Sequence, residues 1–190
     1  MYKAIFNLFF LFIFLSCSSN TEKSGNKIPN QVSIENYQFK EINTPIDLKA
    51  PVITSNQLEI KASPEIVWQV LTNVARWTDW QSSIQTVDAP EMVSEGITFN
   101  WKSGGINFTS SIHTMQKEAM LFGWTGKTIG AYAVHNWKLK PVKSGTIVYV
   151  EESLSGIFPS LLKRKFQNDL ERSMEINLLE LKEYCEKYLN

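Results

Sequence analysis

The chain has 190 residues, with 19 Lys and Arg, 19 Asp and Glu and two His, so its formal net charge is zero. This length is typical of one domain, and an apolar content of 43% is too high for a disordered chain. The lack of a basic excess argues against nucleic-acid binding, which needs a cationic surface to displace counterions. The two cysteines, Cys17 and Cys185, are too few for a multi-disulfide scaffold or a Cys-rich zinc site.

The first 16 residues have the composition of a signal peptide. Lys3 supplies a positive charge, and residues 4–15 form an uncharged and mostly apolar run. A membrane-spanning helix needs about 20 apolar residues, so this run is too short to cross a bilayer. We therefore interpret residues 1–16 as a signal peptide.

The residues around Cys17 resemble a bacterial lipoprotein signal. Ser16 is the small residue before the cysteine, and Phe14 stands where this pattern usually has Leu. The resemblance implies that Cys17 becomes the lipidated N-terminus of an envelope protein, and the absence of Asp after Cys17 favours the outer membrane. Two or three acyl chains would hold such a protein stably on a bilayer. The alternative is an ordinary cleaved signal with an incidental cysteine.

Residues 17–50 are predicted to form the lipidated Cys17 and a mostly flexible tether. Residues 18–36 are rich in Ser, Asn, Lys and Glu and have too few apolar side chains to offset the entropy lost on ordering. Residues 37–50 contain several apolar side chains, and we expect them to dock on the domain at a position that the sequence does not give.

The remaining residues 51–190 show the periodicities of strands followed by one long helix. Residues 57–61 alternate as a strand does, and Ser63 and Pro64 are typical of a helix start that Asn73 ends. A second short helix is predicted over 75–80. Six further strand candidates lie at 83–88, 96–102, 106–116, 119–126, 130–140 and 145–153.

A long amphipathic helix is predicted from Pro159 to Leu189. Apolar residues recur in this range at steps of three and four, which places them on one helix face. Cys185 lies on that apolar stripe, so we interpret it as a core residue. An exposed, reactive thiol is the alternative.

Four segments in fixed order carry a resemblance to a known fold family: Ile60–Trp68, Arg76–Trp80, His135–Leu139 and Gly145–Ser153. Their order and spacing resemble the START/Bet v 1-like superfamily, also called SRPBCC, and in particular its bacterial polyketide cyclase/dehydrase and lipid-transport-like members. The resemblance implies an α+β helix-grip fold. Seven antiparallel strands would curve around the long C-terminal helix, with two short helices after the first strand. Because this fold hosts carriers, receptors and enzymes, it does not by itself specify a function.

Hairpin registers centred on the expected turns predict which side chains face the cavity that this fold implies. We assign to the interior the face that gathers both histidines and the larger aromatic side chains. In these registers His135 lies diagonally from Glu152, while Phe108, Ser110 and Ile112 fall on the opposite face. The predicted ligand-binding residues are Phe122, Trp124, His135, Trp137, Val150, Glu152 and His113.

His135 and Glu152 are the candidates for chemistry. A buried Glu is costly unless it is paired or protonated, and His titrates near neutral pH. The pair could hold a polar group of a ligand or act as a general acid and base, and a purely structural hydrogen bond is the alternative. The sequence has no H-E-x-x-H, C-x-x-C or G-x-S-x-G motif. We expect no cofactor, and no metal site from His113, His135 and Glu152.

These features favour a membrane-anchored lipoprotein of the cell envelope whose domain binds a hydrophobic small molecule or lipid. One alternative is a polyketide cyclase/dehydrase-like enzyme that uses His135 and Glu152 for acid-base chemistry. Another is a structural or interaction domain whose interior is filled by its own tryptophans. The sequence does not specify the ligand or the oligomeric state.

Overall fold

The computed structural model describes residue 39 and residues 41–187. The predicted signal peptide, Cys17 and residues 18–36 lie outside the described residues.

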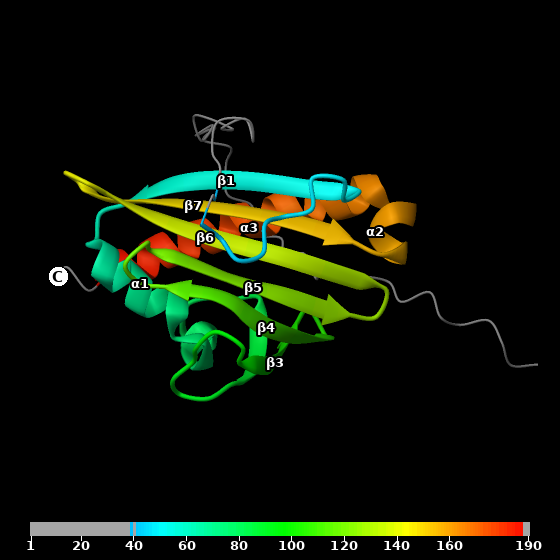
Figure 1. Cartoon of the computed structure of the whole chain (residues 1–190), viewed down its shortest axis with the longest axis horizontal. Helices are drawn as coiled ribbons and strands as arrows, with labels where there is room; N and C mark the ends of the chain where they lie inside the picture. The colour runs from blue at the N-terminus through cyan, green and yellow to red at the C-terminus, as the bar shows by residue number, and fades with distance from the viewer. Residues whose placement is uncertain (1–38, 40, 188–190) are drawn as a thin grey trace, which may run out of the picture.

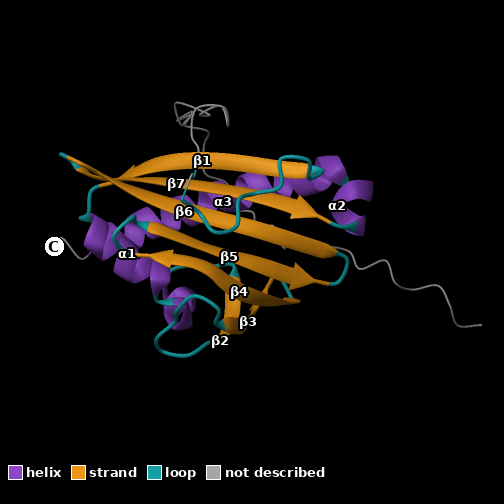
Figure 2. Cartoon of the chain, viewed as in Figure 1, coloured by secondary structure: helices purple, strands orange, loops and turns teal. Residues whose placement is uncertain are grey.

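Seven strands form one antiparallel sheet in the order β1-β7-β6-β5-β4-β3-β2 (Figure 1). Helix α1 (Pro64–Thr72) and the 3-10 helix η2 (Val74–Asp79) follow the first strand, and helices α2 (Ile157–Leu161) and α3 (Lys163–Lys187) follow the last. This is the predicted α+β architecture, with α3 packed along the sheet (Figure 2). The strands are β1 (Val52–Ile60), β2 (Ile84–Asp88), β3 (Thr98–Ser103), β4 (Ile106–Gln116), β5 (Leu121–Thr128), β6 (Ala131–Val142) and β7 (Gly145–Ser155).

Helix α1 begins where the sequence predicts. The side chain of Ser63 accepts a hydrogen bond from the backbone N–H of Ile66 at 3.4 Å, and Pro64 occupies the first helical position. Both features satisfy or avoid the unpaired N–H groups of a first helical turn. Asn73 ends the helix, as predicted.

The prediction of one unbroken C-terminal helix from Pro159 is wrong. Leu162, with φ −118° and ψ 37°, separates the short α2 from α3. The apolar periodicity runs across this break and therefore gave no sign of it. Phe158, Leu161 and Leu162, which the periodicity placed on the buried stripe, are 43%, 75% and 50% exposed.

Helix α3 covers the free edge of β1. The side chain of Gln167 donates to the carbonyl of Ile53 at 2.9 Å, and the ammonium of Lys182 donates to the carbonyl of Glu59 at 3.1 Å. The backbone N–H of Lys61 donates to Glu186 at 2.8 Å. These contacts occupy backbone groups that an uncovered edge strand would leave open to pairing with another chain.

The core lies between α3, the helices after β1 and the concave face of the sheet. Met174, Leu178, Leu181 and Cys185 of α3 are buried in it. Cys185 has no exposed surface, so the interpretation of this cysteine as a core residue is confirmed, and its burial raises the pKa of the thiol to about 12. Large aromatic side chains fill much of the same space: Trp68, Trp77, Trp80, Phe99, Phe122, Trp124 and Trp137.

Residues 41–50 cross the convex face of the sheet. The backbone N–H of Asn43 donates to the hydroxyl of Thr114 at 3.0 Å, and the N–H of Asp47 donates to the hydroxyl of Ser153 at 3.1 Å. Phe39 and Ile42 pack with the buried Leu121. The apolar residues whose position the sequence left open thus cover the outside of the central strands.

No helix within residues 41–187 combines the length and the apolar character needed to cross a membrane.

Gly145 fixes the start of β7, and its substitution should be costly. Its φ is +146°, and a Cβ added there would lie 2.1 Å from the carbonyl oxygen of Ile60. We expect Gly145→Ala to lower the free energy of unfolding by about 2–4 kcal/mol in urea denaturation. Gly105→Ala is the matched control, because Gly105 also has a positive φ (+81°) but open space around it. It should cost only about 1 kcal/mol, and equal losses in the two variants would contradict the steric explanation.

Candidate functional site

The β5–β6–β7 register brings a histidine and a glutamate together on the concave face. His135 of β6 lies directly opposite Trp124 of β5 on one side and Glu152 of β7 on the other. Nδ1 of His135 and Oε2 of Glu152 are 2.6 Å apart, and their side chains are 10% and 12% exposed. The two predicted candidates for chemistry therefore form a largely buried, charge-assisted hydrogen bond.

The imidazole belongs to a stack of aromatic rings. The ring centroids of His135 and Trp124 are 4.4 Å apart with an interplanar angle of 11°. Those of His135 and Trp137 are 5.3 Å apart with an angle of 24°. The centroids of the two tryptophan rings are themselves 6.4 Å apart, so the three rings form one cluster. Contact with both tryptophans, together with the bond to Glu152, holds the imidazole in one orientation.

The far nitrogen of this imidazole has unused hydrogen-bonding capacity. Nε2 of His135 is buried and has no partner among the described residues. In a neutral imidazole whose Nδ1–H donates to a carboxylate, Nε2 carries the lone pair and can accept a hydrogen bond. If the ring is protonated, Nε2 donates instead. Either form leaves a polar atom in an apolar wall, where a ligand hydroxyl or carbonyl would relieve the cost of its burial.

A cavity of about 270 Å³ adjoins this pair. Aromatic residues form much of its wall, and the first half of α3 contributes both apolar and polar side chains. The volume lies just below the range of about 300–1,000 Å³ that is usual for small-molecule sites, so the space suits a small ligand. The wall residues most relevant to recognition are Trp77, Trp101, Phe108, Trp124, His135, Glu152, Phe166, Asp169, Leu170, Ser173 and Asn177.

The predicted ligand-binding residues divide into three groups: those that line the cavity, those buried in the core beside it, and His113. Trp124, His135 and Glu152 line the cavity. Phe122, Trp137 and Val150 lie on the same face but are buried in the core beside it. The predicted registers of the β5–β6 and β6–β7 hairpins differ from the structure by two residues, and an even shift keeps the side chains of these strands on their predicted face. The same slip brings His135 directly opposite Glu152, where a diagonal arrangement was predicted.

The prediction that His113 faces the interior is wrong. A bulge in β4 leaves His113 without a paired residue on β5, because Ile112 pairs with Trp124 and Thr114 with Gly123. A bulge adds one residue to one strand, which reverses the facing on one side of it. The ring of His113 lies on the convex face beside Gly123, where an added Cβ would come within 2.5 Å of it.

The same bulge turns the preceding part of β4 inward. Ile112 is part of the core, Phe108 lines the cavity, and the hydroxyl of Ser110 accepts a hydrogen bond from Nε1 of Trp101 at 2.9 Å. All three had been predicted to face outward. His113 is thus separated from His135 and Glu152 by the sheet, and no cluster of three or more potential metal ligands is found within residues 41–187.

Sequence reasoning missed the contribution of α3 to the cavity. Asp169, Ser173 and Asn177 recur every four residues and therefore lie on one helix face, next to the apolar residues of the core. That spacing is visible in the sequence. The apolar stripe that predicts the buried face of the helix does not include these three polar positions.

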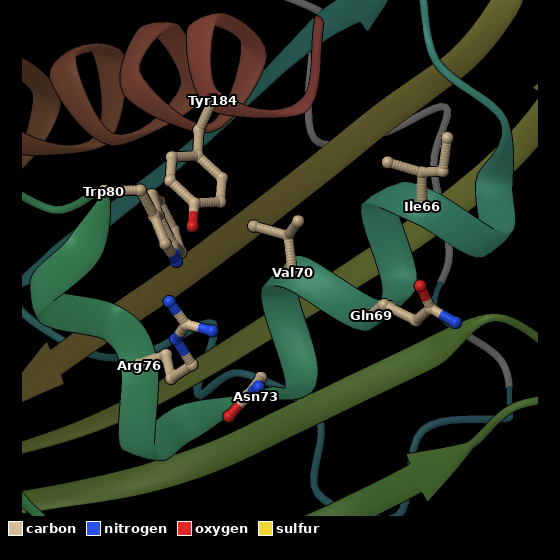
Figure 3. A pocket seen from close by; sticks show the side chains of 7 residues that line it. All are labelled: Ile66, Gln69, Val70, Asn73, Arg76, Trp80 and Tyr184. Atoms are coloured by element: carbon tan, nitrogen blue, oxygen red, sulfur yellow. The ribbon is translucent and has the colours of Figure 1, made fainter. Parts of the chain in front are cut away.

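A second hollow, of about 440 Å³, lies between α1, η2 and the C-terminal part of α3 (Figure 3). In Figure 3, Arg76 and Trp80 from η2 and its C-cap and Tyr184 from α3 point toward the same space, with Val70 of α1 at its side. Arg76 already forms an ion pair with Asp79 at 2.6 Å. We place the candidate site in the inner cavity, where the largely buried, hydrogen-bonded His135–Glu152 pair lies in an aromatic wall.

Comparison with known proteins agrees with this architecture. Residues 51–186 match the family described as polyketide cyclase / dehydrase and lipid transport. The chain belongs to this family. A search of curated proteins found no similar sequence.

Several solved structures share the fold of this chain at low sequence identity. A hypothetical protein of Helicobacter pylori, jhp0584, superimposes with a TM-score of 0.69 at 14% identity, covering 78% of this chain and 98% of its own. The Zhui aromatase/cyclase of Streptomyces sp. R1128 gives 0.62 at 13% identity, covering 73% and 95%. Ara h 8.0201 gives 0.57 at 12% identity, covering 71% and 97%. These likenesses establish the Bet v 1-like fold.

A second polar cluster lies under residues 41–50 on the convex face. The side-chain amide of Asn136 donates to Glu151 at 3.0 Å and to the carbonyl of Thr44 at 3.2 Å. Burial raises the pKa of Glu151 to about 7, partly opposed by the bond from Asn136. Burial also lowers the pKa of His113 to about 4, partly opposed by the charge of Glu95. Both groups are therefore neutral in the folded protein over much of the mildly acidic range.

These two shifts predict opposite dependences of stability on pH. Folding raises the affinity of Glu151 for its proton, so its contribution to the free energy of unfolding falls as pH rises from 4.5 to about 7. Folding lowers the affinity of His113, so its contribution rises as pH rises from about 4 to 6.5. Relative to the wild type, Glu151→Gln should make the slope of stability against pH more positive. His113→Gln should make it more negative.

The measurement is urea denaturation at several pH values between 4 and 7. The change in slope for Glu151→Gln should not exceed about 1.4 kcal/mol per pH unit, the value for one proton. Glu118→Gln is a control, because Glu118 is exposed in the β4–β5 turn. Slopes that shift in the same direction for both test variants would contradict the assignment.

Proposed function

We propose that this domain binds a small hydrophobic molecule in the cavity between α3 and the concave face of the sheet. The proposed ligand carries a ring or a short chain, which would lie against Trp124 and the other aromatic wall residues. Its hydroxyl or carbonyl group would meet the His135–Glu152 pair in the cavity wall, where Nε2 of His135 is one of the buried polar atoms that lack a partner among the described residues. A mostly apolar wall with a few orienting polar groups is typical of small-molecule sites.

The single observation that carries this proposal is the His135–Glu152 pair set in that wall. Burying two ionisable groups costs free energy, and apolar residues at the same two positions of the sheet would avoid this cost. Binding of a ligand through a hydrogen-bonding group would explain why ionisable residues occupy these two positions. Membership in a family described by lipid transport and cyclase activity is consistent with a hydrophobic ligand.

We further propose that the domain is held at the cell envelope by lipid on Cys17, with the signal peptide of residues 1–16 removed. The support is the sequence pattern alone: an apolar run, Ser16 and then Cys17. The same pattern favours the outer membrane with the domain facing the periplasm, and the tether would let the domain reach ligands held in the bilayer.

The geometry of the pair also favours an alternative, a cyclase/dehydrase-like enzyme. Nδ1 of His135 is held by Glu152 at 2.6 Å, which leaves Nε2 to take up or deliver a proton. A carboxylate that orients an imidazole and stabilises its protonated form is a recurring arrangement in acid-base catalysis. The bound compound would then be a substrate with an ionisable C–H or hydroxyl group.

Filling the cavity should abolish ligand binding without unfolding the protein. Ala133 lines the cavity, so Ala133→Leu should weaken binding of the neutral fluorescent probe N-phenyl-1-naphthylamine by about tenfold or more. Ala75→Leu makes the same change on η2, outside the cavity wall, and should bind as the wild type does. The measurement is fluorescence titration, with thermal unfolding to verify folding.

Native mass spectrometry of protein purified from its own envelope should in addition show a co-purifying small molecule. Its absence, together with equal probe binding by Ala133→Leu and Ala75→Leu, would exclude a ligand in this cavity and favour a structural role. Conversion of the co-purified compound by the wild type but not by His135→Ala would favour the enzyme.

The anchor has its own test. Cells grown with radiolabelled palmitate should incorporate the label into the wild-type protein and recover it in the membrane fraction. Cys17→Ala should remove the label, while Cys185→Ala, which changes the buried cysteine, should keep it. A labelled Cys17→Ala protein would rule out lipidation at this position.

A further inference from the structure

A group of large apolar side chains is exposed at the mouth of the cavity. Two of them, Ile129 and Phe158, line the cavity and also reach solvent, so the exposed surface continues directly into the binding space. Exposed apolar groups that cluster in this way mark interaction sites more often than isolated ones do. We call this group the mouth patch: Ile129 (88% exposed), Ile157 (67%), Phe158 (43%), Leu161 (75%) and Leu162 (50%).

The mouth patch is held in place by the fold. The backbone N–H of Phe158 donates to the carbonyl of Gly130 at 3.3 Å, and a Cβ on Gly130 would lie 2.5 Å from the ring of Phe158. Helix α2 is thereby packed on the β5–β6 turn, and Pro159 is the buried residue of this helix. Figure 1 shows α2 at one end of the sheet, beyond the tip of β7. The exposure of Ile157 and Leu161 therefore belongs to an ordered element.

Positive charge adjoins the mouth patch on one side. Residues 156–168 contain Lys163, Arg164 and Lys165 and no acidic residue. Lys165 pairs with Asp169 at 2.5 Å, whereas Lys163 and Arg164 have no ion pair among the described residues. A short helix with exposed aliphatic side chains next to uncompensated basic residues suits the boundary between lipid headgroups and acyl chains.

We propose that the mouth patch and the basic residues after it dock onto the surface of a membrane that contains anionic lipids. Ile157 and Leu161 enter the acyl-chain boundary, and Lys163 and Arg164 meet lipid phosphates. The charge argues for this partner, because the basic residues match anionic headgroups. The mouth of the cavity then opens toward the bilayer, so a hydrophobic ligand can enter without crossing water. This orientation is separate from any anchor at Cys17, which could hold the domain near a membrane in many orientations.

A fluorescent label near the mouth patch tests this orientation in the full chain. Ser160 is exposed on α2 and is not part of the patch, so Ser160→Cys in a Cys17→Ser background places a thiol there. Cys185 is buried, and burial raises its pKa to about 12, so it does not compete for the dye at neutral pH. The matched label is Met92→Cys, at an 87% exposed position in the loop between β2 and β3.

The labelled proteins are mixed with vesicles of phosphatidylcholine and phosphatidylglycerol that carry nitroxide groups on their acyl chains. No ligand is added, so the result does not depend on what the cavity binds. We expect quenching of the dye at position 160 and none at position 92. Vesicles of phosphatidylcholine alone should quench the dye at position 160 much less.

Variants assign the effect to the named side chains. In the Ser160→Cys background, Ile157→Ser with Leu161→Ser should abolish quenching. Lys163→Gln with Arg164→Gln should raise the lipid concentration needed by about fivefold for each charge. The matched control is Ile176→Ser with Leu179→Ser, which removes exposed apolar side chains of α3 outside the patch and should have no effect.

Three results would overturn the proposal. Equal quenching at positions 92 and 160, or none at 160, would show that the patch does not face the bilayer. Dimerisation in light scattering that is lost in the Ile157→Ser, Leu161→Ser variant, without quenching by vesicles, would assign the patch to a second copy of the chain. If Ala133→Leu loses probe binding but the dye at position 160 is still quenched, the result supports the membrane-docking surface and affects only the ligand site in the cavity.

Discussion

The register of the β6–β7 hairpin is the constraint on which the rest of this structure depends. A two-residue turn at Lys143 and Ser144 joins the strands, and Gly145 lies so close to Ile60 that no side chain fits. That register sets His135 opposite Glu152 on one face and Asn136 opposite Glu151 on the other. Two neighbouring glutamates are thereby assigned to different environments, one in the cavity wall and one under the segment that crosses the convex face.

The two faces use their buried polar groups differently. On the convex face, Glu151 and Asn136 bond to each other, and Asn136 also bonds to the backbone of Thr44, so this cluster holds residues 41–50 against the sheet. On the concave face, His135 and Glu152 bond to each other in the wall of the cavity. Both faces leave buried polar atoms without a partner among the described residues: Nε2 of His135 on the concave face, and Oδ1 of Asn136 and Nε2 of His113 on the convex face. The first arrangement fulfils a structural role within the domain, whereas the second lies beside a space that a ligand can enter.

The aromatic side chains that fill the core limit the size of the ligand that can enter the cavity. Tryptophan and phenylalanine side chains from both the sheet and the helices occupy most of the space under α3, and about 270 Å³ remains near its N-terminal end. The remaining space opens where α2 exposes its apolar side chains beside basic residues. A small ligand and a mouth that faces a lipid surface are therefore two consequences of one packing arrangement.

The sequence by itself determined the element order, the antiparallel sheet and the facing of Trp124, His135 and Glu152, because alternation along a strand survives any even error in register. It could not determine the facing of His113, since one extra residue in β4 reverses the alternation and the bulge leaves no mark in composition. It also could not show the break at Leu162, because apolar periodicity is the same in one helix or two. Only the tertiary structure decided which apolar side chains of that region are buried and which remain exposed, since packing partners come from strands distant in the chain.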